Sequence, residues 1–496
     1  MSDFILDCKG ISKSFGGVHA LKNVDLRVKR GEVHCLAGEN GCGKSTIIKA
    51  ISGFQPQDSG TIEFNGKVYH ALSPVVSIDL GIQVIYQDLS VFPNLTVQEN
   101  LAINTVLSNK TKIYSHRQQR EIAKKVMETL NLDLDLDARV EQLHVASKQL
   151  IAIARALYAK ANFLILDEPT TALTRKEVDR LFEIIRGLKE QGMTILFVSH
   201  KLDEMYEISD SITIMRSGEA VYTGPMKTLS EEDFTRYMTG RNIHLVNDKQ
   251  ASGRIQTESK PALEVSDLSG PGFRDISFSV QPGEILGITG QLGSGRSELC
   301  NTIFGVTCAT KGRILRDGKP VNIRSVKDAT RNGIALVPED RLTEGLFLPI
   351  SIMENITLVN YPQFSKNGLL VQEEQEKNAS GWVDEIHVKT EDSRLPAQTL
   401  SGGNQQKVVL AKWLSTKPKV LILNGPTVGV DIGAKYDIYQ LLRDLASTGM
   451  AVVVASDDLA EVVRLCDRSI VMRSGFMSGE IAGAELTVEN LTRAIM

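Results

Sequence analysis

The 496-residue chain lacks the features that mark several common classes of protein. Its six cysteines include no C-x-x-C pair and its eight histidines no H-x-x-x-H pair, so neither a zinc-type nor a redox-type spacing is present. No apolar run approaches the ~20 residues of a membrane span, and the N-terminal MSDFILDCKG lacks the basic and apolar regions of a signal peptide. We therefore expect reduced thiols, and action at a membrane only through a partner.

An excess of one charge is also missing. The chain carries 56 basic and 60 acidic residues, a net charge of −4, whereas a dedicated nucleic-acid binder usually has a basic excess. No nucleic-acid partner is therefore expected. The 42% hydrophobic and 23% charged residues are ordinary for a soluble globular protein, and the length suggests two to four domains.

The chain contains one pattern twice. GEVHCLAGENGCGKSTIIKAISG begins at Gly31, and GEILGITGQLGSGRSELCNTIFG begins 252 residues later. LILDEPTTALT from Leu164 returns as LILNGPTVGVD 257 residues later. Segments that recur in one order indicate homologous domains, here predicted over residues 1–241 and 261–496. The polar stretch 242–260 has no apolar periodicity and is predicted to be a linker.

Each copy has the rhythm of an α/β domain. VHCLA, FLILD and TILFVSH are short apolar runs typical of buried strands, and RKEVDRLFEIIRGLKEQG carries its apolar residues at helical spacing. Alternating strands and helices favour a mostly parallel sheet covered on both faces. Residues 88–142 and 340–399 lack this rhythm and are expected to form a smaller helical subdomain.

The first copy contains the phosphate-binding pattern G-x-x-x-x-G-K-[ST] between a strand pattern and a helix pattern. The residues of this P-loop and of the helix start are Gly38, Glu39, Asn40, Gly41, Cys42, Gly43, Lys44, Ser45 and Thr46. Glycines let backbone N–H groups surround a phosphate, and the helix N-terminus adds a positive dipole end. Lys44 would neutralise the β- and γ-phosphates and the Ser45 hydroxyl would bind Mg²⁺. Cys42 is expected to fill a small slot, with a redox role as the alternative.

Two carboxylates end the strand pattern FLILD. Asp167 could hold the water shell of Mg²⁺, and Glu168 lies where a base could orient an attacking water. A lone Asp-Glu pair at a strand end is by default solvated. A pair that follows a P-loop in this order favours the catalytic interpretation.

Further motifs make nearly the whole chain resemble the ABC ATPases, twice. They are VIYQD with Gln87, LSGGNQQ from Leu400, LILDEPT, and FVSH ending at His200. The resemblance implies an α/β fold of two tandem P-loop NTPase domains. Each would have a RecA-like, mostly parallel core, a helical subdomain and a small antiparallel β part. It also implies ATP hydrolysis, with ATP and Mg²⁺ bound.

The same resemblance implies roles for single residues. Phe15 would stack on adenine, His200 would contact the γ-phosphate, and Glu168 would be the base. Gln87 would sense the γ-phosphate and the membrane partner, and would hold Mg²⁺ together with Ser45 and Asp167. Two such domains pair head to tail, so the signature of one closes over the P-loop of the other and each ATP site is composite. The second copy would contribute Ser401, Gly402, Gly403 and Asp431.

The two copies have lost different parts of this machinery. At the positions of Lys44, Gln87, Asp167, Glu168 and His200, the second copy has Arg296, Glu339, Asn424, Gly425 and Asp457. Arginine fits a point contact with phosphate poorly, the two new carboxylates would repel a γ-phosphate, and no base remains. No aromatic residue of the second copy matches Phe15.

The first copy has instead a degraded signature. His144 and Val145 stand where the second copy has Ser401 and Gly402, and Thr174 stands where it has Asp431. Head-to-tail pairing would collect every intact part in one composite site and nearly every degraded part in the other. We therefore predict one hydrolytic site per chain. Whether the second site binds nucleotide is left open.

Two classes of function are compatible with these motifs: an importer ATPase docked onto permeases, and a soluble tandem ATPase acting on ribosomes or DNA. The short, mildly charged linker and the absence of zinc-type cysteines favour the importer. VPEDR from Val337, SIMEN from Ser351 and the P-loop Arg296 resemble the fused ATPases of monosaccharide importers of the ribose, galactose, xylose and arabinose type. The chain departs from that family at Asn424-Gly425, where Asp-Glu is usual, and at His144, where serine is usual.

This second resemblance implies the partners. They would be two polytopic permease subunits and a periplasmic or lipid-anchored sugar-binding protein, with peripheral association at the cytoplasmic face of the bacterial inner membrane. The permease contact would lie around residues 87–100 and 339–355, although LTVQENL within the first range is also an ordinary helix start. The sequence does not specify the sugar or the number of chains per transporter.

Overall fold

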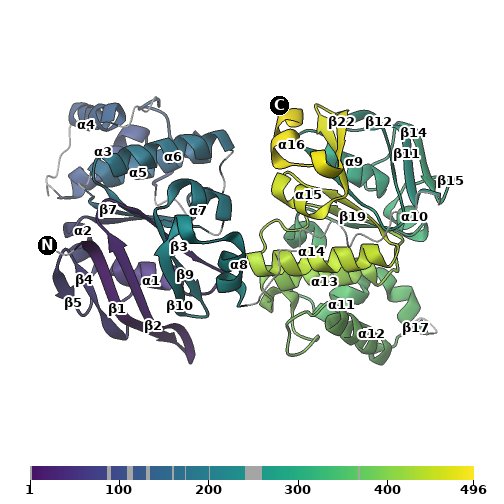
Figure 1. The fold of residues 1–496 in the computed structure, drawn as a ribbon, viewed down its shortest axis with the longest axis horizontal. Coiled ribbons are helices and arrows are strands. Elements are labelled where there is room, and N and C mark those ends of the chain that lie inside the picture. Colours follow the sequence, from purple (N-terminus) through teal and green to yellow (C-terminus); the bar gives the residue numbers. More distant parts are fainter. Residues whose placement is uncertain are drawn as a thin grey trace. The chain divides into compact units, whose positions relative to one another are not determined.

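The structure is a computed structural model that describes residues 3–86, 91–108, 116–129, 134–158, 161–171, 173, 175–199, 201–240, 260–366 and 369–496. It divides into two compact units, residues 1–244 and 245–496 (Figure 1). Apart from Lys260, the predicted linker 242–260 lies outside the described residues. The domain boundaries 1–241 and 261–496 therefore stay predictions.

The first unit contains two sheets. The larger has the order β10-β9-β3-β8-β7-β6, in which β10 runs antiparallel to β9 and the other pairs are parallel. Its strands are β3 (Val33–Gly38), β6 (Ile82–Ile85), β7 (Phe163–Asp167), β8 (Thr194–Val198), β9 (Ser211–Arg216) and β10 (Glu219–Pro225). The smaller, antiparallel sheet has the order β2-β1-β4-β5. Its strands are β1 (Phe4–Phe15), β2 (Val18–Lys29), β4 (Ser59–Phe64) and β5 (Lys67–Tyr69).

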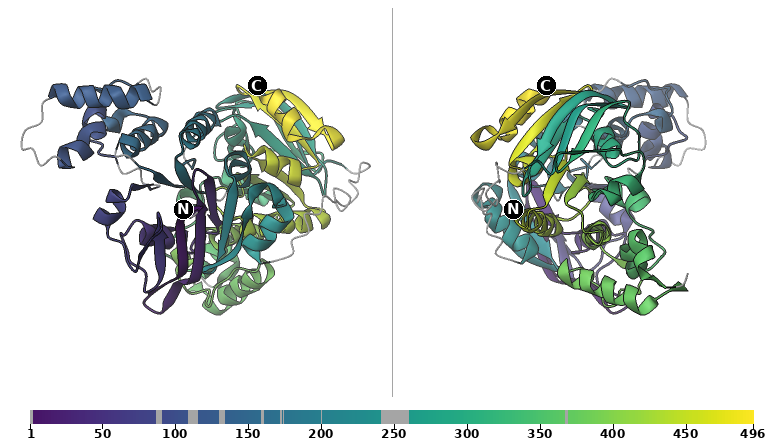
Figure 2. Two further views of the ribbon diagram at one scale, coloured as in Figure 1. Left: turned by 60° about the vertical axis from the view of Figure 1, so that its left-hand side comes forward. Right: turned by 90° about the vertical axis from the view of Figure 1, so that its right-hand side faces the viewer.

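The helices of the first unit fall into two groups. Those that accompany the sheets are α1 (Lys44–Ile51), α2 (Pro74–Asp79), α6 (Arg175–Glu190), α7 (Leu202–Ile208) and α8 (Glu231–Thr239). Those of the helical part are α3 (Val97–Ser108), α4 (His116–Thr129) and α5 (Val145–Tyr158), which share a small hydrophobic core of their own. Both ribbon views place this helical part at the end of the unit away from the antiparallel strands (Figures 1 and 2).

The second unit repeats this plan. Its larger sheet has the order β16-β19-β20-β13-β21-β22, with only the β21–β22 pair antiparallel among the described strands. The strands are β13 (Ile285–Gly290), β16 (Ile334–Val337), β19 (Val420–Asn424), β20 (Ala451–Ala455), β21 (Arg468–Arg473) and β22 (Phe476–Ala482). The antiparallel sheet β12-β11-β14-β15 consists of β11 (Leu263–Gly270), β12 (Phe273–Val280), β14 (Lys311–Arg316) and β15 (Lys319–Val321).

The helices of the second unit match those of the first in order. They are α9 (Arg296–Ile303), α10 (Val326–Arg331), α11 (Ile352–Thr357), α12 (Gln372–Glu385), α13 (Gly402–Leu414), α14 (Ile432–Ser447), α15 (Leu459–Leu465) and α16 (Val488–Ile495). β17 (Ser365–Lys366) pairs antiparallel with β18 (Leu369–Leu370). The predicted helical content of residues 340–399 is thus present as α11, α12 and short turns.

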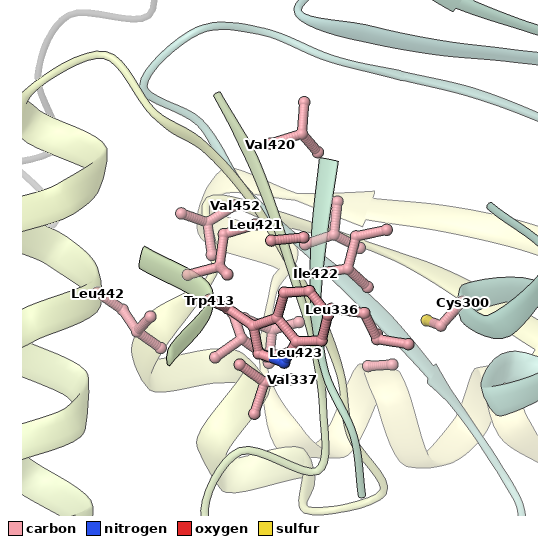
Figure 3. Close-up of a cluster of buried hydrophobic side chains, with 14 of the residues drawn as sticks. Cys300, Leu336, Val337, Trp413, Val420, Leu421, Ile422, Leu423, Leu442 and Val452 are labelled. Carbon is pink, nitrogen blue, oxygen red and sulfur yellow. The ribbon is translucent and has the colours of Figure 1, made fainter. Parts of the chain in front are cut away.

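Hydrophobic burial explains why these segments adopt these structures. Every residue of β3 and of β8 is buried, as the apolar runs predict for strands covered on both faces. The apolar residues of α6 line one buried face, and the chain leaves the helix through Gly192 at φ 88°. In the second unit, side chains of β16 and β19 meet Trp413 of α13 in one core (Figure 3), where Trp413 packs edge-on against Phe304 at 5.0 Å.

Candidate nucleotide-binding sites

The P-loop of the first unit connects β3 to α1 and encloses Lys44. The Lys44 side chain is buried, and its ammonium donates hydrogen bonds to the carbonyl oxygens of Gly38 at 2.6 Å and Glu39 at 3.0 Å. A β-carbon on Gly38 would lie 2.3 Å from Cys42 Sγ, and Gly43 has φ 107°. Glycine is therefore required at both positions, one for space and one for backbone conformation. The loop holds the ammonium at the start of α1, where the helix dipole also favours an anion.

The two neighbours of Lys44 at the helix start differ from it in exposure. Ser45 is exposed and Thr46 half-buried, so both lie at the solvent-facing side of the loop. Cys42 is buried, and burial raises the pKa of its thiol. A protonated, buried thiol in contact with Gly38 supports the space-filling role rather than the redox role.

Asp167 and Glu168 lie at the carboxyl end of β7, separated from β3 by β8 alone. Carboxyl ends of parallel strands are where α/β sheets bind ligands. Burial, and next the charge of Glu168, raise the pKa of Asp167, while Lys44 opposes this shift. The P-loop and the two carboxylates thus follow the carboxyl ends of β3 and β7, on the same side of the sheet.

Glu168 has a strained backbone. Its φ of 48° lies in the left-handed region, which costs a residue with a β-carbon about 1–2 kcal/mol. The strain is held by a hydrogen bond from the Glu168 amide to the Val198 carbonyl at 3.0 Å. Thr171 Oγ1 donates to the Glu168 carbonyl at 3.2 Å. Strained backbone held in this way is a common feature of functional sites.

Phe15, Gln87 and His200 are the other residues predicted to contact the nucleotide in the first unit. Phe15 ends β1 with 39% of its surface exposed, and Lys13 Nζ lies 5.7 Å from the ring centroid. The exposed part of this ring is apolar surface on which a base could stack. Gln87 and His200 lie outside the described residues.

Magnesium fits the donors that are described. The Ser45 hydroxyl and the Asp167 carboxylate are hard oxygen ligands, and Mg²⁺ commonly takes one or two protein ligands together with phosphate oxygens and water. Within the described ranges, no group of three or more His, Cys, Asp and Glu side chains is arranged to hold a metal by itself. A site that is completed by the phosphates of the nucleotide is consistent with both observations.

In the second unit, the same backbone carries a different set of side chains. Arg296 is buried in its P-loop, and its guanidinium donates to the Gly290 carbonyl at 2.8 Å and lies 3.3 Å from the Asp457 carboxylate. Gly425 has φ 59°, and its amide donates to the Ala455 carbonyl at 2.8 Å, so it repeats the conformation of Glu168 without a β-carbon. Burial raises the pKa of Cys300, on the helix that follows this loop, to about 12.

Ser297, the residue after Arg296, takes part in a second hydrogen-bond network, with Glu339 and Asn424. The Ser297 hydroxyl lies 3.2 Å from a Glu339 carboxylate oxygen and 3.3 Å from the Asn424 amide oxygen. The Asn424 side chain donates to the same Glu339 oxygen at 3.2 Å. These residues stand at the positions of Ser45, Gln87 and Asp167, so groups that would bind Mg²⁺ in the first unit bind one another in the second.

The signature and the following helix of the second unit pack closely. Ser401 precedes α13 and accepts a hydrogen bond from Asn404 Nδ2 at 2.9 Å. Asp431 caps α14 by accepting from the Ala434 amide at 2.8 Å. A β-carbon on Gly403 would lie 2.3 Å from that of Ala434. The signature glycines are thus needed for packing inside the unit, in addition to any approach to a phosphate.

The signature region of the first unit is looser. α5 begins at Val145, whose surface is 41% exposed, and Ala146 stands at the position of Gly403. A cavity of about 130 Å³ lies between α5 and α6, lined by Ala146, Leu150, Glu177 and Leu181 among others. Thr174 lies outside the described residues.

The two segments expected to face a permease begin their helices with the same local structure. Ser351 and Glu354 form a capping box at α11, and Thr96 and Glu99 make the matching contacts at α3. Asn355 is buried and holds the preceding loop through hydrogen bonds to its backbone. These residues therefore have a folding role of their own, and they do not by themselves indicate a partner.

Comparison with known proteins identifies the family. The family model described as ABC transporter matches residues 21–171 and 273–428. The chain belongs to the ABC transporter family. It is an ABC-type ATPase with two tandem P-loop NTPase domains, and the resemblance inferred from the motifs is confirmed. No helix in the described part of the chain is long and apolar enough to span a membrane.

Curated relatives align over almost the entire length. The ribose import ATP-binding protein RbsA 1 of Agrobacterium fabrum is 40% identical, with 99% of this chain and 96% of the relative covered. The RbsA protein of Oceanobacillus iheyensis is also 40% identical, with 97% of this chain and 97% of the relative covered. The RbsA protein of Lactococcus lactis subsp. lactis is 40% identical, with 98% of each chain covered. A solved nucleotide-free ATP-binding cassette from an ABC transporter is 28% identical with a TM-score of 0.41, covering 47% of this chain and 94% of that one.

Sequence reasoning missed three features of the sites. It did not foresee that Asp457 pairs with Arg296, or that Glu339 and Asn424 bind Ser297, because it treated both carboxylates only as repelling a phosphate. It also did not assign a role to Arg341, whose only sequence signal is its place in VPEDR, two residues after the counterpart of Gln87.

Proposed function

We propose that this chain hydrolyses ATP to drive the import of a simple sugar. Two polytopic permease subunits and a periplasmic or lipid-anchored sugar-binding protein would be its partners, at the cytoplasmic face of a bacterial inner membrane. The alignment of nearly the whole chain with ribose import ATP-binding proteins carries this proposal. The same relatives give no support to a soluble ATPase that acts on ribosomes or DNA.

Hydrolysis is assigned to the first P-loop. Lys44 would bind the β- and γ-phosphates, Phe15 the adenine, and Glu168 the water that attacks the γ-phosphorus in line. Mg²⁺, when bound, would neutralise charge that develops on the phosphate oxygens. Ser45 and Asp167, together with Gln87, would hold it, and His200 would contact the γ-phosphate.

The second domain is proposed to complete this site. Ser401, Gly402 and Gly403 at the start of α13 would present a hydroxyl and bare backbone to the phosphates, with Asp431 beside them. The close packing of α13 on the start of α14 supports this role, because it holds the signature and Asp431 as one rigid edge. ATP binding would close the two domains and hydrolysis would reopen them.

The second P-loop is proposed to be inactive. Its cation, Arg296, already has an anionic partner in Asp457, and its Ser297 hydroxyl is engaged by Glu339 and Asn424. A nucleotide would have to displace both interactions, and no carboxylate stands at the position of Glu168. These contacts support one hydrolytic site per chain.

The transport proposal is tested by identifying partners. A tagged Glu168→Gln chain, which should retain ATP, is expressed in its native cells and solubilised in mild detergent with ATP. We expect a polytopic membrane protein and a solute-binding protein to co-purify, and the binding protein can then be screened against sugars. Recovery of ribosomes or DNA without a membrane protein would overturn the import proposal and leave the ATPase.

A further inference from the structure

Arg341 links three segments of the second unit that are distant in the sequence. It lies four residues after β16 and begins a short turn over Arg341–Gly345. Its guanidinium donates to the Val428 carbonyl at 2.6 Å and to the Gly429 carbonyl at 2.9 Å, and its Nε lies 3.4 Å from Gln405 Oε1. Val428 and Gly429 belong to the loop between β19 and α14, and Gln405 belongs to α13.

The guanidinium also packs against the start of the signature helix. A β-carbon on Gly402 would lie 2.8 Å from Arg341 Nη2 and 3.0 Å from the Gly429 carbonyl oxygen. The backbone of Gly402, the loop carbonyls and the guanidinium plane are therefore in mutual contact. The planar guanidinium holds its N–H groups in a fixed fork, so it binds the two carbonyls with two of its nitrogens while its plane packs on Gly402, and the compact ammonium of a lysine does not reproduce this shape.

A second cation fastens the same turn from the other side. The Lys412 ammonium, buried on α13, donates to the Gly345 carbonyl at the end of the turn. The first residue of the turn, Arg341, thus contacts the start of the signature helix α13 through its own side chain. The last residue of the turn, Gly345, is bound to α13 by Lys412. Displacement of the turn would move the start of α13.

The arginine is present in the copy whose signature is intact. The offset between the copies is 252 residues at Gln87 and Glu339 and 255 at Thr96 and Ser351, so the second copy has three extra residues in the stretch that contains Arg341. The corresponding stretch of the first copy, residues 88–95, contains no arginine. The first copy has also lost the signature glycine at Val145. The arginine therefore occurs in the copy that has the signature glycine with which it is in contact.

We propose that Arg341 is a positioning residue for ATP hydrolysis at the first P-loop. This inference rests on the proposed function, in which Ser401, Gly402 and Asp431 close over the nucleotide bound by the first domain. Arg341 fixes the signature and the loop before Asp431 relative to each other. It also connects them to residues 339–355, the segment expected to face a permease.

The proposal is tested by ATPase kinetics of the full-length chain with its co-purified partners. Arg341→Ala should lower kcat at least tenfold, since small misplacement of groups that position a reaction costs up to about 10²-fold. The KM for MgATP should change less than about threefold, because Lys44 and Phe15 remain in place. Arg341→Lys should recover only part of kcat, because the flexible ammonium lacks the fixed planar fork that binds both loop carbonyls and packs against Gly402.

The control is Arg394→Ala, which removes an exposed arginine paired with Asp392 in the same unit and should leave kcat unchanged. A kcat for Arg341→Ala within twofold of wild type would overturn the proposal, and so would a rise in KM with kcat unchanged. If Arg341→Ala does not fold, Arg341→Lys alone carries the test, and an unchanged kcat in it is contradictory. Glu168→Gln is measured in parallel, because turnover that survives in that variant refutes the assignment of hydrolysis to the first P-loop rather than the role of Arg341.

Discussion

Glu168 offers a direct test of the idea that the hydrolytic site stores backbone strain. Its φ of 48° and the φ of 59° at Gly425 show the same left-handed conformation at the same point of both sheets. We expect Glu168→Gly to relieve strain of about 1–2 kcal/mol, partly offset by the greater freedom of glycine in the unfolded chain, about 0.5–1 kcal/mol. The first unit should gain roughly 0.5–1 kcal/mol over Glu168→Ala, which keeps the β-carbon, and both variants should be inactive.

The two tryptophans of the chain, Trp382 and Trp413, both belong to the second unit, so their fluorescence cannot report this change. Hydrogen exchange of the amides of β7 and β8, followed by mass spectrometry, measures the stability of the first unit directly. Urea unfolding followed by tryptophan fluorescence should be identical in the two variants. Equal or faster exchange in Glu168→Gly than in Glu168→Ala would refute the strain argument.

Three further predictions concern the second unit. Gly402→Ala should reduce ATP turnover at least tenfold, because its β-carbon would lie 2.8 Å from Arg341 Nη2. Val145→Gly, the matched change in the first unit, should leave turnover unchanged. Equal effects of the two changes would contradict the proposal that only the second signature serves hydrolysis. Asp457→Ser should free Arg296 from its ion pair, so that equilibrium dialysis detects a second bound ATP per chain. An unchanged number of bound ATP molecules would show that this ion pair is not what prevents binding at the second P-loop. Burial lowers the pKa of Lys412 from 10.5 to about 8. Between these two pH values the unfolded chain binds more protons than the folded chain. The free energy of unfolding of the second unit should therefore increase as the pH rises from 8 to 10, by at most about 3 kcal/mol. Urea unfolding followed by tryptophan fluorescence checks this, and the same rise in Lys412→Met would exclude Lys412 as its source.

Local pattern was enough to predict the parts of the fold that are built from apolar runs. VHCLA lies in β3, FLILD forms β7, and the first five residues of TILFVSH form β8. α6 buries the face that its spacing predicts. The P-loop and Asp167-Glu168 could be located because their spacing along the chain is fixed by one strand–loop–helix unit. Gln87 and His200 lie outside the described residues, so their predicted roles stay predictions.

The contacts that distinguish the second unit could not be predicted in the same way. Arg341 binds the carbonyls of Val428 and Gly429, which lie 87 and 88 positions further along the chain. Every residue has a backbone carbonyl, so the sequence does not show which ones a side chain binds. Asp457 and Asn424 are visible in the sequence only as departures from the intact pattern. That they neutralise and occupy the P-loop, rather than merely weaken it, depends on how β16, β19 and β20 bring their ends together.

The central claim is that one P-loop of the two supports hydrolysis. It is tested most directly by ATP turnover of the full-length chain, with its partners, as Glu168→Gln and as Arg296→Ala. Loss of the base should reduce kcat by at least about 10²-fold, while Arg296→Ala should leave kcat within about twofold of wild type. Comparable losses in the two variants would contradict the account.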